Sequence, residues 1–199
     1  MRYIVLDTSH TFLRVGLVEE DQVVCSYQEP CHKSQSELIL PVLVQLMGEA
    51  QWSVDQIDGV VVTAGPGSYT GVRIAMTVAK VLCAVKPIAL YTLSTLQAYA
   101  GLASNALAVM DARSNRVYAG WYDQGTAKQK DTILSIEEAK ELQQKKQLNC
   151  IGDAQLLNQE GKKVDVIANI IALHHAWQKE ENIHTIVPTY LKDQDAYGK

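Results

Sequence analysis

The sequence predicts an α/β protein of two lobes, each built on a mixed sheet that helices cover. Three closely spaced apolar runs open the chain, and alternating helical and strand patterns follow, which is typical of a mixed sheet with helices on its faces. The second half repeats the theme of strand, aspartate, hairpin and third strand in shortened form. We therefore expect a first lobe over residues 1–103 and a smaller second lobe over residues 104–199. No linker separates them, so they should pack tightly.

The first lobe is predicted to open with an antiparallel meander. Its first apolar run stops at Asp7, Thr8 and Ser9, as expected where a buried strand meets a turn. The connections between the runs are short, and strands joined so closely pair with their neighbours. The three predicted strands cover residues 3–6, 11–18 and 22–27.

The rest of the first lobe alternates helices with strands. Ser36 can cap the first helix, while Pro41 lies either in its first turn and a half or at a kink. Ser53 begins a capping box that opens one short turn, and Pro87 ends the second helix. The predicted helices cover residues 36–50, 72–85 and 95–103, and the strands between them cover residues 59–63 and 88–91.

The second lobe is predicted to repeat this order with fewer elements. Its first strand ends in Asp111, as the first strand of the chain ends in Asp7. Ser135 and Glu138 form a capping box ahead of a helix. The predicted strands cover residues 106–110, 117–122, 130–134 and 148–152, and the helices cover residues 136–145 and 164–178.

Composition narrows the classes of protein that fit. The chain has 199 residues, a net charge of −4 and 47% hydrophobic residues, which fits a globular protein. A pI near 5.7 argues against the broad basic surface that holds nucleic acid without help. The four cysteines show no CxxC spacing and indicate free thiols in a reducing compartment. The first apolar run is too short for a signal peptide and no stretch resembles a membrane span, so we expect a cytoplasmic protein.

Two aspartates at the ends of corresponding strands are candidate residues of a nucleotide cleft between the lobes. Asp7, Thr8 and Ser9 offer a carboxylate and two hydroxyls, which can hold a metal–phosphate group. The alternative is a turn in which these side chains bond their own backbone. Asp111 would face the same cleft from the second lobe. Neither turn has the glycine that lets phosphates approach the backbone, which weighs against ATP hydrolysis.

The loop Gly-Pro-Gly-Ser-Tyr-Thr-Gly over residues 65–71 is the sharpest local motif. It joins a buried strand to a helix start, where free N–H groups and the helix dipole can bind an anion, so Gly65, Gly67 and Ser68 are candidate anion-binding residues. No Gly-Lys-Ser/Thr follows at the spacing of a Walker A loop. The alternative is a tight connection in which Ser68 or Thr70 caps the helix.

The helices predicted at residues 36–50 and 72–85 are apolar around nearly their whole circumference. A helix apolar on all sides is buried on all sides. A chain of this size has few places to surround two such helices. We therefore favour a partner on their outer face over an entirely internal core.

Spacing predicts no metal site and no nucleophile–base pair. His174 and His175 are adjacent on a predicted helix and point about 100° apart, so they cannot share an ion easily. The sequence contains no HExxH and no G-x-S-x-G. Four basic residues of the second lobe indicate a solvated hairpin rather than a nucleic-acid contact. They are Arg113, Arg116, Lys128 and Lys130.

Several motifs occur in an order that identifies a family. They are Ile-Val-Leu-Asp-Thr-Ser (4–9), Gly-Pro-Gly-Ser-Tyr-Thr-Gly-Val-Arg-Ile (65–74), Leu-Ser-Thr-Leu (93–96), Met-Asp-Ala-Arg (110–113) with Val-Tyr (117–118), and Pro-Thr-Tyr-Leu-Lys (188–192). Together they closely resemble the TsaB/TsaD family, and within it the TsaB (YeaZ) type. The resemblance runs from the first strand to residue 192. It implies the two-lobed actin-like ATPase fold, which is ribonuclease H-like.

The resemblance also implies a function and partners. TsaB-type members are the non-catalytic part of the bacterial machinery that forms N6-threonylcarbamoyladenosine in tRNA. The chain would pair with a TsaD-like transferase as a heterodimer, work with a TsaE-like ATPase, form a homodimer when alone and meet tRNA only indirectly. It would have no catalytic or metal site, no membrane contact and at most weak or partner-dependent ATP or ADP binding.

Pairing in this family uses the first two helices, which here are residues 36–50 and 70–85. The candidate interface residues are Leu38, Ile39, Val42, Leu43, Leu46, Val72, Arg73, Met76, Thr77 and Lys80.

Three departures from the family pattern stand out. Gln35, Ser36 and Glu37 replace the His-Ser-Glu that often precedes the first helix, with His32 displaced upstream. The metal-binding histidine pair of TsaD is absent. The region after residue 125 looks short, so the second lobe should be reduced. The alternative function is a nucleotide-binding or metal-dependent enzyme of the same fold, either an ATPase or a peptidase.

Overall fold

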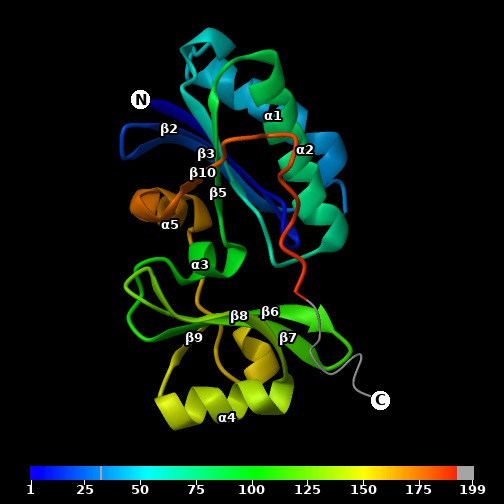
Figure 1. The fold of residues 1–199 in the computed structure, drawn as a ribbon, viewed down its shortest axis with the longest axis vertical. Helices are drawn as coiled ribbons and strands as arrows, with labels where there is room; N and C mark the ends of the chain where they lie inside the picture. Colours follow the sequence, from blue (N-terminus) through cyan, green and yellow to red (C-terminus); the bar gives the residue numbers. More distant parts are fainter. Residues whose placement is uncertain (32, 192–199) are drawn as a thin grey trace.

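The protein consists of two lobes stacked along its long axis (Figure 1). The structure is a computed structural model that describes residues 1–31 and 33–191. Over these residues the upper lobe holds a six-stranded sheet in the order β10-β5-β4-β1-β2-β3, and the lower lobe holds a four-stranded sheet in the order β8-β7-β6-β9. Both sheets mix parallel and antiparallel pairs. The predicted α/β architecture, with the second lobe the smaller, is confirmed.

The first lobe follows the predicted order of elements. Its elements are β1 (Arg2–Asp7), β2 (Phe12–Glu19), β3 (Gln22–Pro30), α1 (Gln35–Glu49), η1 (Val54–Gln56), β4 (Gly59–Thr63), α2 (Tyr69–Val85), β5 (Ala89–Leu93) and α3 (Thr95–Ala100). The first three form the expected meander. The first helix starts after Ser34 rather than at Ser36, and it continues through Pro41. The last helix ends early because Gly101 takes a positive φ of 56°.

The second lobe also matches its prediction closely. Its elements are β6 (Ala106–Arg113), β7 (Arg116–Asp123), β8 (Thr126–Ser135), α4 (Ile136–Lys146), β9 (Asn149–Gly152) and η2 (Ala154–Leu157). The capping box of Ser135 and Glu138 begins α4 as expected. Asp111 lies inside β6 rather than at its end, because the hairpin with β7 extends to Arg113.

The C-terminal part of the chain returns to the first lobe. Residues 164–178 were predicted to be mostly helical, and they are, although the helix is interrupted and ends before Gln178. The segment forms α5 (Val166–Ala172), η3 (His174–Ala176) and β10 (Gln178–Lys179). β10 pairs antiparallel with β5, where Gln178 faces Thr92. Residues from both sides of the 103/104 boundary therefore build the six-stranded sheet.

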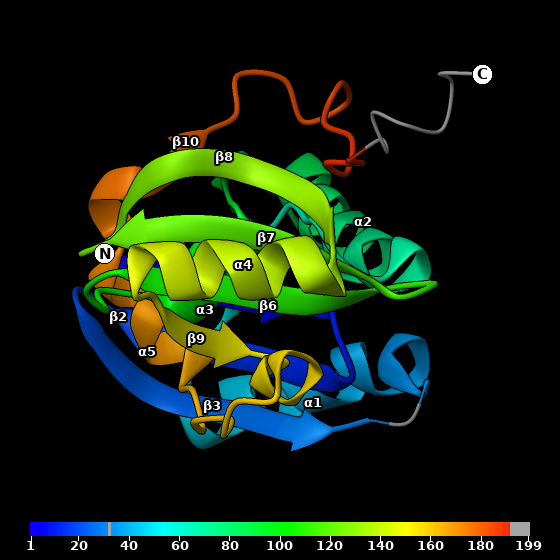
Figure 2. The same cartoon turned by 90° about the horizontal axis from the view of Figure 1, so that it is seen from below.

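Helices cover both faces of the six-stranded sheet. α1 and α2 pack on one face, and α3 and α5 pack on the other, where they lie between the lobes (Figure 1). Side chains alternate along β1, so Ile4 and Leu6 face α1 and α2 while Val5 faces α3 and α5. α4 lies on the outer face of the second sheet (Figure 2). Among the described residues, no helix has the length and apolar character that a bilayer crossing requires.

Candidate functional site

A cleft of about 860 Å³ lies between the lobes. The turn after β1 and the N-terminal turns of α1 and α2 line one side, and the ends of β6 and β9 line the other. This volume suits a small-molecule ligand. Of the candidate cleft residues, Ser9, Gly67, Ser68 and Asp111 line it. The other three, Asp7, Thr8 and Gly65, lie outside its lining.

Asp7 lies fully buried beneath the cleft, where it binds other side chains of the protein. Its Oδ2 accepts a hydrogen bond from Arg14 Nη1 at 2.8 Å. Its Oδ1 accepts from Ser9 Oγ at 2.5 Å and from Thr63 Oγ1 at 2.6 Å. Burial by itself raises the pKa of Asp7, but the Arg14 charge and these hydrogen bonds outweigh it and lower the pKa. Side chains of the protein engage both carboxylate oxygens of Asp7. A nucleotide cleft at this position stays a prediction.

Thr8 and the glycines of the 65–71 loop join the first hairpin to α2. Thr8 Oγ1 donates to the carbonyl of Gly71 at 2.6 Å and accepts from the N–H of Ala75 at 3.1 Å. A Cβ on Gly67 would lie 2.4 Å from the Ser9 carbonyl oxygen, and one on Gly71 would lie 2.1 Å from the Thr8 carbonyl oxygen. These glycines are therefore required for close backbone packing inside the protein, whether or not a ligand binds.

Ser68 caps α2, as one of the two sequence interpretations had it. Its Oγ accepts from the N–H of Gly71 at 3.2 Å, which starts the helix at Tyr69, three residues before the predicted position. The first turn of α2 borders the cleft, so an anion at this helix start stays a prediction.

Asp111 caps its own hairpin rather than reaching across the cleft. Its Oδ1 accepts from the backbone N–H of Arg113 at 2.8 Å. Its own backbone N–H donates to Asp153 Oδ2 at 2.8 Å. The two strand-end aspartates that the sequence singled out therefore both serve local structure.

The carboxylate that crosses the cleft is Asp153, which sequence reasoning missed. It follows β9, and its Oδ2 lies 3.0 Å from Nε2 of His10 in the first lobe. Burial by itself raises the pKa of Asp153, but His10 and the N–H of Asp111 outweigh it and lower the pKa. A signal existed, because Asp153 directly follows a strand that pairs parallel to β6.

The outer face of α1 and α2 is the second candidate site, and only part of the predicted interface lies on it. Six of the ten candidate residues face the sheet and belong to the core of the first lobe. They are Ile39, Val42, Leu43, Leu46, Val72 and Met76. Of the remainder, Leu38 is 38% exposed, Arg73 and Thr77 are exposed, and Lys80 is half-buried. These six side chains are buried in the isolated chain, so most of the surface that α1 and α2 offer comes from other residues.

Four other apolar residues lie on the outer face. Leu40 and Val44 project from α1 and are 51% and 70% exposed, and Val81 and Val85 project from α2 and are 57% and 75% exposed. We call these four residues the outer apolar face. Apolar residues gathered on a surface mark an interaction site more often than scattered ones do.

Arg73 and Lys80 bind the protein's own C-terminal segment, which runs beside α2 (Figure 1). Lys80 Nζ donates to the carbonyl of Ile186 at 2.6 Å, and Arg73 Nε donates to the hydroxyl of Tyr190 at 2.7 Å. The Tyr69 and Tyr190 rings stack with centroids 5.1 Å apart. The segment carries the predicted 188–192 motif as far as residue 191, while Lys192 and the displaced His32 lie outside the described residues.

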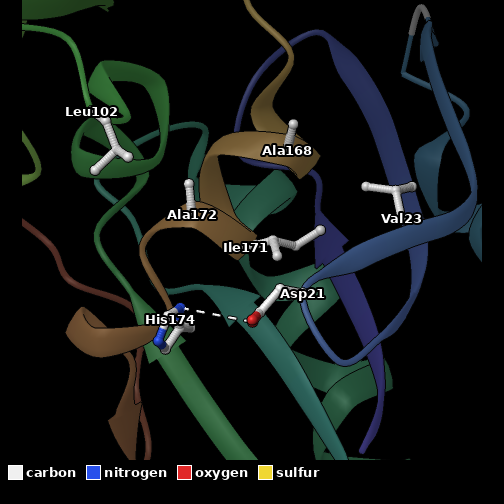
Figure 3. A pocket seen from close by; sticks show the side chains of 7 residues that line it. All are labelled: Asp21, Val23, Leu102, Ala168, Ile171, Ala172 and His174. Atoms are coloured by element: carbon white, nitrogen blue, oxygen red, sulfur yellow. Dashed lines mark ion pairs between the residues drawn. The ribbon is translucent and has the colours of Figure 1, made fainter.

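A smaller apolar pocket of about 290 Å³ lies between the β2–β3 turn and α5 (Figure 3). Val23 and Ile171 line it, and His174 Nδ1 lies 3.9 Å from Asp21 Oδ1 at its rim. Within residues 1–31 and 33–191, no three His, Cys, Asp or Glu side chains gather as metal ligands would. The basic residues 113, 116, 128 and 130 lie on the hairpins that join β6, β7 and β8. Lys128 Nζ lies 3.6 Å from Asp123 Oδ2 there.

Comparison with known proteins places the chain in a family. The family model of TsaD, described as tRNA N6-adenosine threonylcarbamoyltransferase, matches residues 29–174. The chain belongs to the TsaB/TsaD family. It is similar to the tRNA threonylcarbamoyladenosine biosynthesis protein TsaB of Bacillus subtilis, with 34% identity over an alignment of 129 residues that covers 61% of this chain and 55% of that protein.

Other relatives and structures agree with this placement. A TsaB from Buchnera aphidicola subsp. Baizongia pistaciae is 25% identical over 94% of this chain and 96% of its own length. The Escherichia coli TsaB is 30% identical over 61% of this chain, and, as with the Bacillus protein, only 55% of its length is matched. A solved structure, YeaZ from Pseudomonas aeruginosa, superposes with a TM-score of 0.77 at 22% identity, over 96% of this chain and 99% of that one. The TsaB-type resemblance and the actin-like fold are confirmed.

Proposed function

We propose that the chain is a non-catalytic scaffold and activator subunit in the formation of N6-threonylcarbamoyladenosine in tRNA. It acts by pairing with a TsaD-like transferase, and a TsaE-like ATPase completes the machinery. Membership of the family and the names of the TsaB relatives support the pathway. A net charge of −4 supports an indirect role, in which a partner holds the tRNA.

The observation that carries the pairing is the outer apolar face. Four large apolar side chains project from two adjacent helices of an otherwise well-packed lobe. A partner of the same fold presents its own pair of helices, so helix can pack on helix with apolar side chains buried from both subunits. The two pairs of helices would then lie between the sheet of this chain and the sheet of its partner.

The geometry of the cleft supports a silent subunit rather than an enzyme. A catalytic carboxylate needs free oxygens to bind a metal or activate water. Asp7 engages both of its oxygens with Arg14, Ser9 and Thr63. The alternative, an ATPase or a peptidase of this fold, is tested by measuring Mg-ATP binding and turnover, and the metal content, of the isolated chain. Tight ATP binding with turnover would overturn the silent assignment.

The pairing is tested by placing a charge on the outer apolar face. Val44→Glu and Val81→Glu each put a carboxylate where the partner's helices would exclude water, at a cost of several kcal/mol of binding free energy if it stays unpaired. We expect both variants to stay folded and to lose the heterodimer when mixed with the cognate TsaD-like protein. Solution mass from light scattering measures the complex.

Val24→Glu is the matched control. Val24 is also exposed, but it lies on the edge strand β3 and not on α1 or α2. This variant should form the complex as the unaltered chain does. If Val44→Glu and Val81→Glu both still bind the transferase and support modification of tRNA, the proposal fails.

A further inference from the structure

One hydrogen-bonded pair joins the two lobes across the cleft. His10 lies in the turn after β1, and its Nε2 is 3.0 Å from Oδ2 of Asp153 in the second lobe. The His10 and Asp153 side chains are only 21% and 16% exposed. The same carboxylate oxygen accepts the backbone N–H of Asp111 at 2.8 Å, which links the pair to β6. His10 Nδ1 lies 3.0 Å from Thr11 Oγ1, which orients the ring.

The buried carboxylate of Asp7, which lies beneath this pair, is neutralised by an arginine of the protein. Arg14 forms an ion pair with Asp7 at 2.8 Å, and its guanidinium carbon lies 5.1 Å from the centroid of the Tyr99 ring. Tyr99 belongs to α3, which lies between the lobes, and its ring meets the His10 ring edge-on with centroids 6.4 Å apart. A protein cation therefore compensates the strand-end carboxylate, so no ligand is needed to do so.

Apolar packing also joins the two lobes. α3 and α5 share one core cluster with residues of both sheets, including Val5 and Val61 from the first and Ala108 and Met110 from the second. Asn169 Nδ2 of α5 donates to the carbonyl of Ala98 in α3 at 3.0 Å. The lobes are thus joined by a continuous core, by the hydrogen bond from Ser94 to Asp131, and by His10 and Asp153 across the cleft.

We propose that His10 and Asp153 form a latch, which holds the cleft edge of the two lobes in one arrangement without a ligand. A hydrogen bond to a carboxylate that is mostly removed from water is stronger than one between neutral groups. Two lobes joined by a core and by a bond across the cleft resist hinge motion, as a subunit that acts by presenting a surface requires. The latch does not depend on which partner the outer apolar face binds.

Hydrogen exchange of the intact chain tests the latch. The Asp111 amide is the reporter, because it donates to the carboxylate that His10 holds in place. In His10→Ala the Asp153 side chain loses its partner in the first lobe, and the Asp111 amide should exchange about tenfold faster. Amides of the turn at residues 9–11 should also exchange faster. Core amides of β6, such as that of Ala108, should keep their rates.

Asp111→Asn is the matched control for the amides of the turn at residues 9–11, which should keep their wild-type rates. Its side-chain oxygen can still accept the Arg113 N–H, and it does not cross the cleft. Asp153→Ala removes the same contact from the other side, so the amides of the turn at residues 9–11 should exchange faster, as in His10→Ala. The double variant should add little there, since both changes remove one contact. Unchanged exchange at residue 111 and in the turn in His10→Ala would overturn the latch. Equal acceleration of the core amides would also overturn it, because it indicates general destabilisation. Slower exchange of the Asp111 amide and the turn amides in the wild-type chain on addition of Mg-ATP would overturn it too, because it indicates that a ligand closes the cleft.

Discussion

Three aspartates near the cleft show how the environment of a residue decides its role. Asp7 is buried and paired with Arg14, Asp111 caps its own hairpin, and Asp153 reaches the other lobe. The sequence placed the first two at strand ends, which is correct to within three residues. The groups that bind these aspartates are brought near them by the register of the first hairpin and by the parallel pairing of β6 with β9. Arg14 lies directly opposite Asp7 in the β1–β2 register, so this pair follows once the meander is known.

Asp7→Asn tests the role of that pair in stability. The substitution leaves the buried Arg14 guanidinium without its counter-charge, which should reduce the free energy of unfolding by about 3–5 kcal/mol at pH 7. The pKa of Asp7 is lowered in the folded state, so its contribution is present above the unfolded pKa, near 4, and is lost as pH falls through the folded pKa. The difference between the two proteins should therefore shrink in acid. Urea unfolding at pH 7 and at pH 3 measures it, and equal stability at pH 7 would contradict the prediction.

Secondary structure was largely predictable at the scale of elements, because caps and strand alternation are local signals. The predicted bounds of α2, α4 and β4 are correct to within a few residues, because Ser68 and Ser135 cap the two helices and the strand is a continuous apolar run. The inward face of α1 and α2 was not predictable. Periodicity identifies a buried face only when the opposite face is polar, and these helices are apolar on both. That is why six core residues were assigned to the interface.

Two adjacent residues of α1 separate the inward face from the outward one. Leu43 is 4% exposed and Val44 is 70% exposed, so the same glutamate has opposite consequences. Leu43→Glu buries an unpaired carboxylate in the first lobe and should cost several kcal/mol, enough to unfold much of the protein. Val44→Glu should change the stability of the isolated chain by less than about 1 kcal/mol. Thermal unfolding by circular dichroism measures both, and similar melting temperatures would show that the orientation of α1 is wrong.

The two-lobed arrangement was predictable at the scale of the whole molecule, because the second half repeats the pattern of the first. The return of the C-terminal segment was not. β10 is two residues long, and its contact with β5 joins positions 86 residues apart at Gln178 and Thr92, which leaves no local pattern in the sequence. The same segment then occupies Arg73 and Lys80 of α2. An interface predicted from the helix sequence alone therefore includes residues that bind another segment of the same chain.

The outer apolar face can hold only one partner at a time, and this determines the assembly of the molecule. If the isolated chain covers Val44, Val81 and Val85 with a second copy of itself, the homodimer and the heterodimer exclude each other. Adding the TsaD-like protein should then convert the measured mass from two copies of this chain to one copy of each subunit, by mass action. Val81→Glu should abolish both species and leave a monomer, since one charge disrupts both contacts. A stable complex of two copies of this chain with one transferase would show that the two contacts use different surfaces.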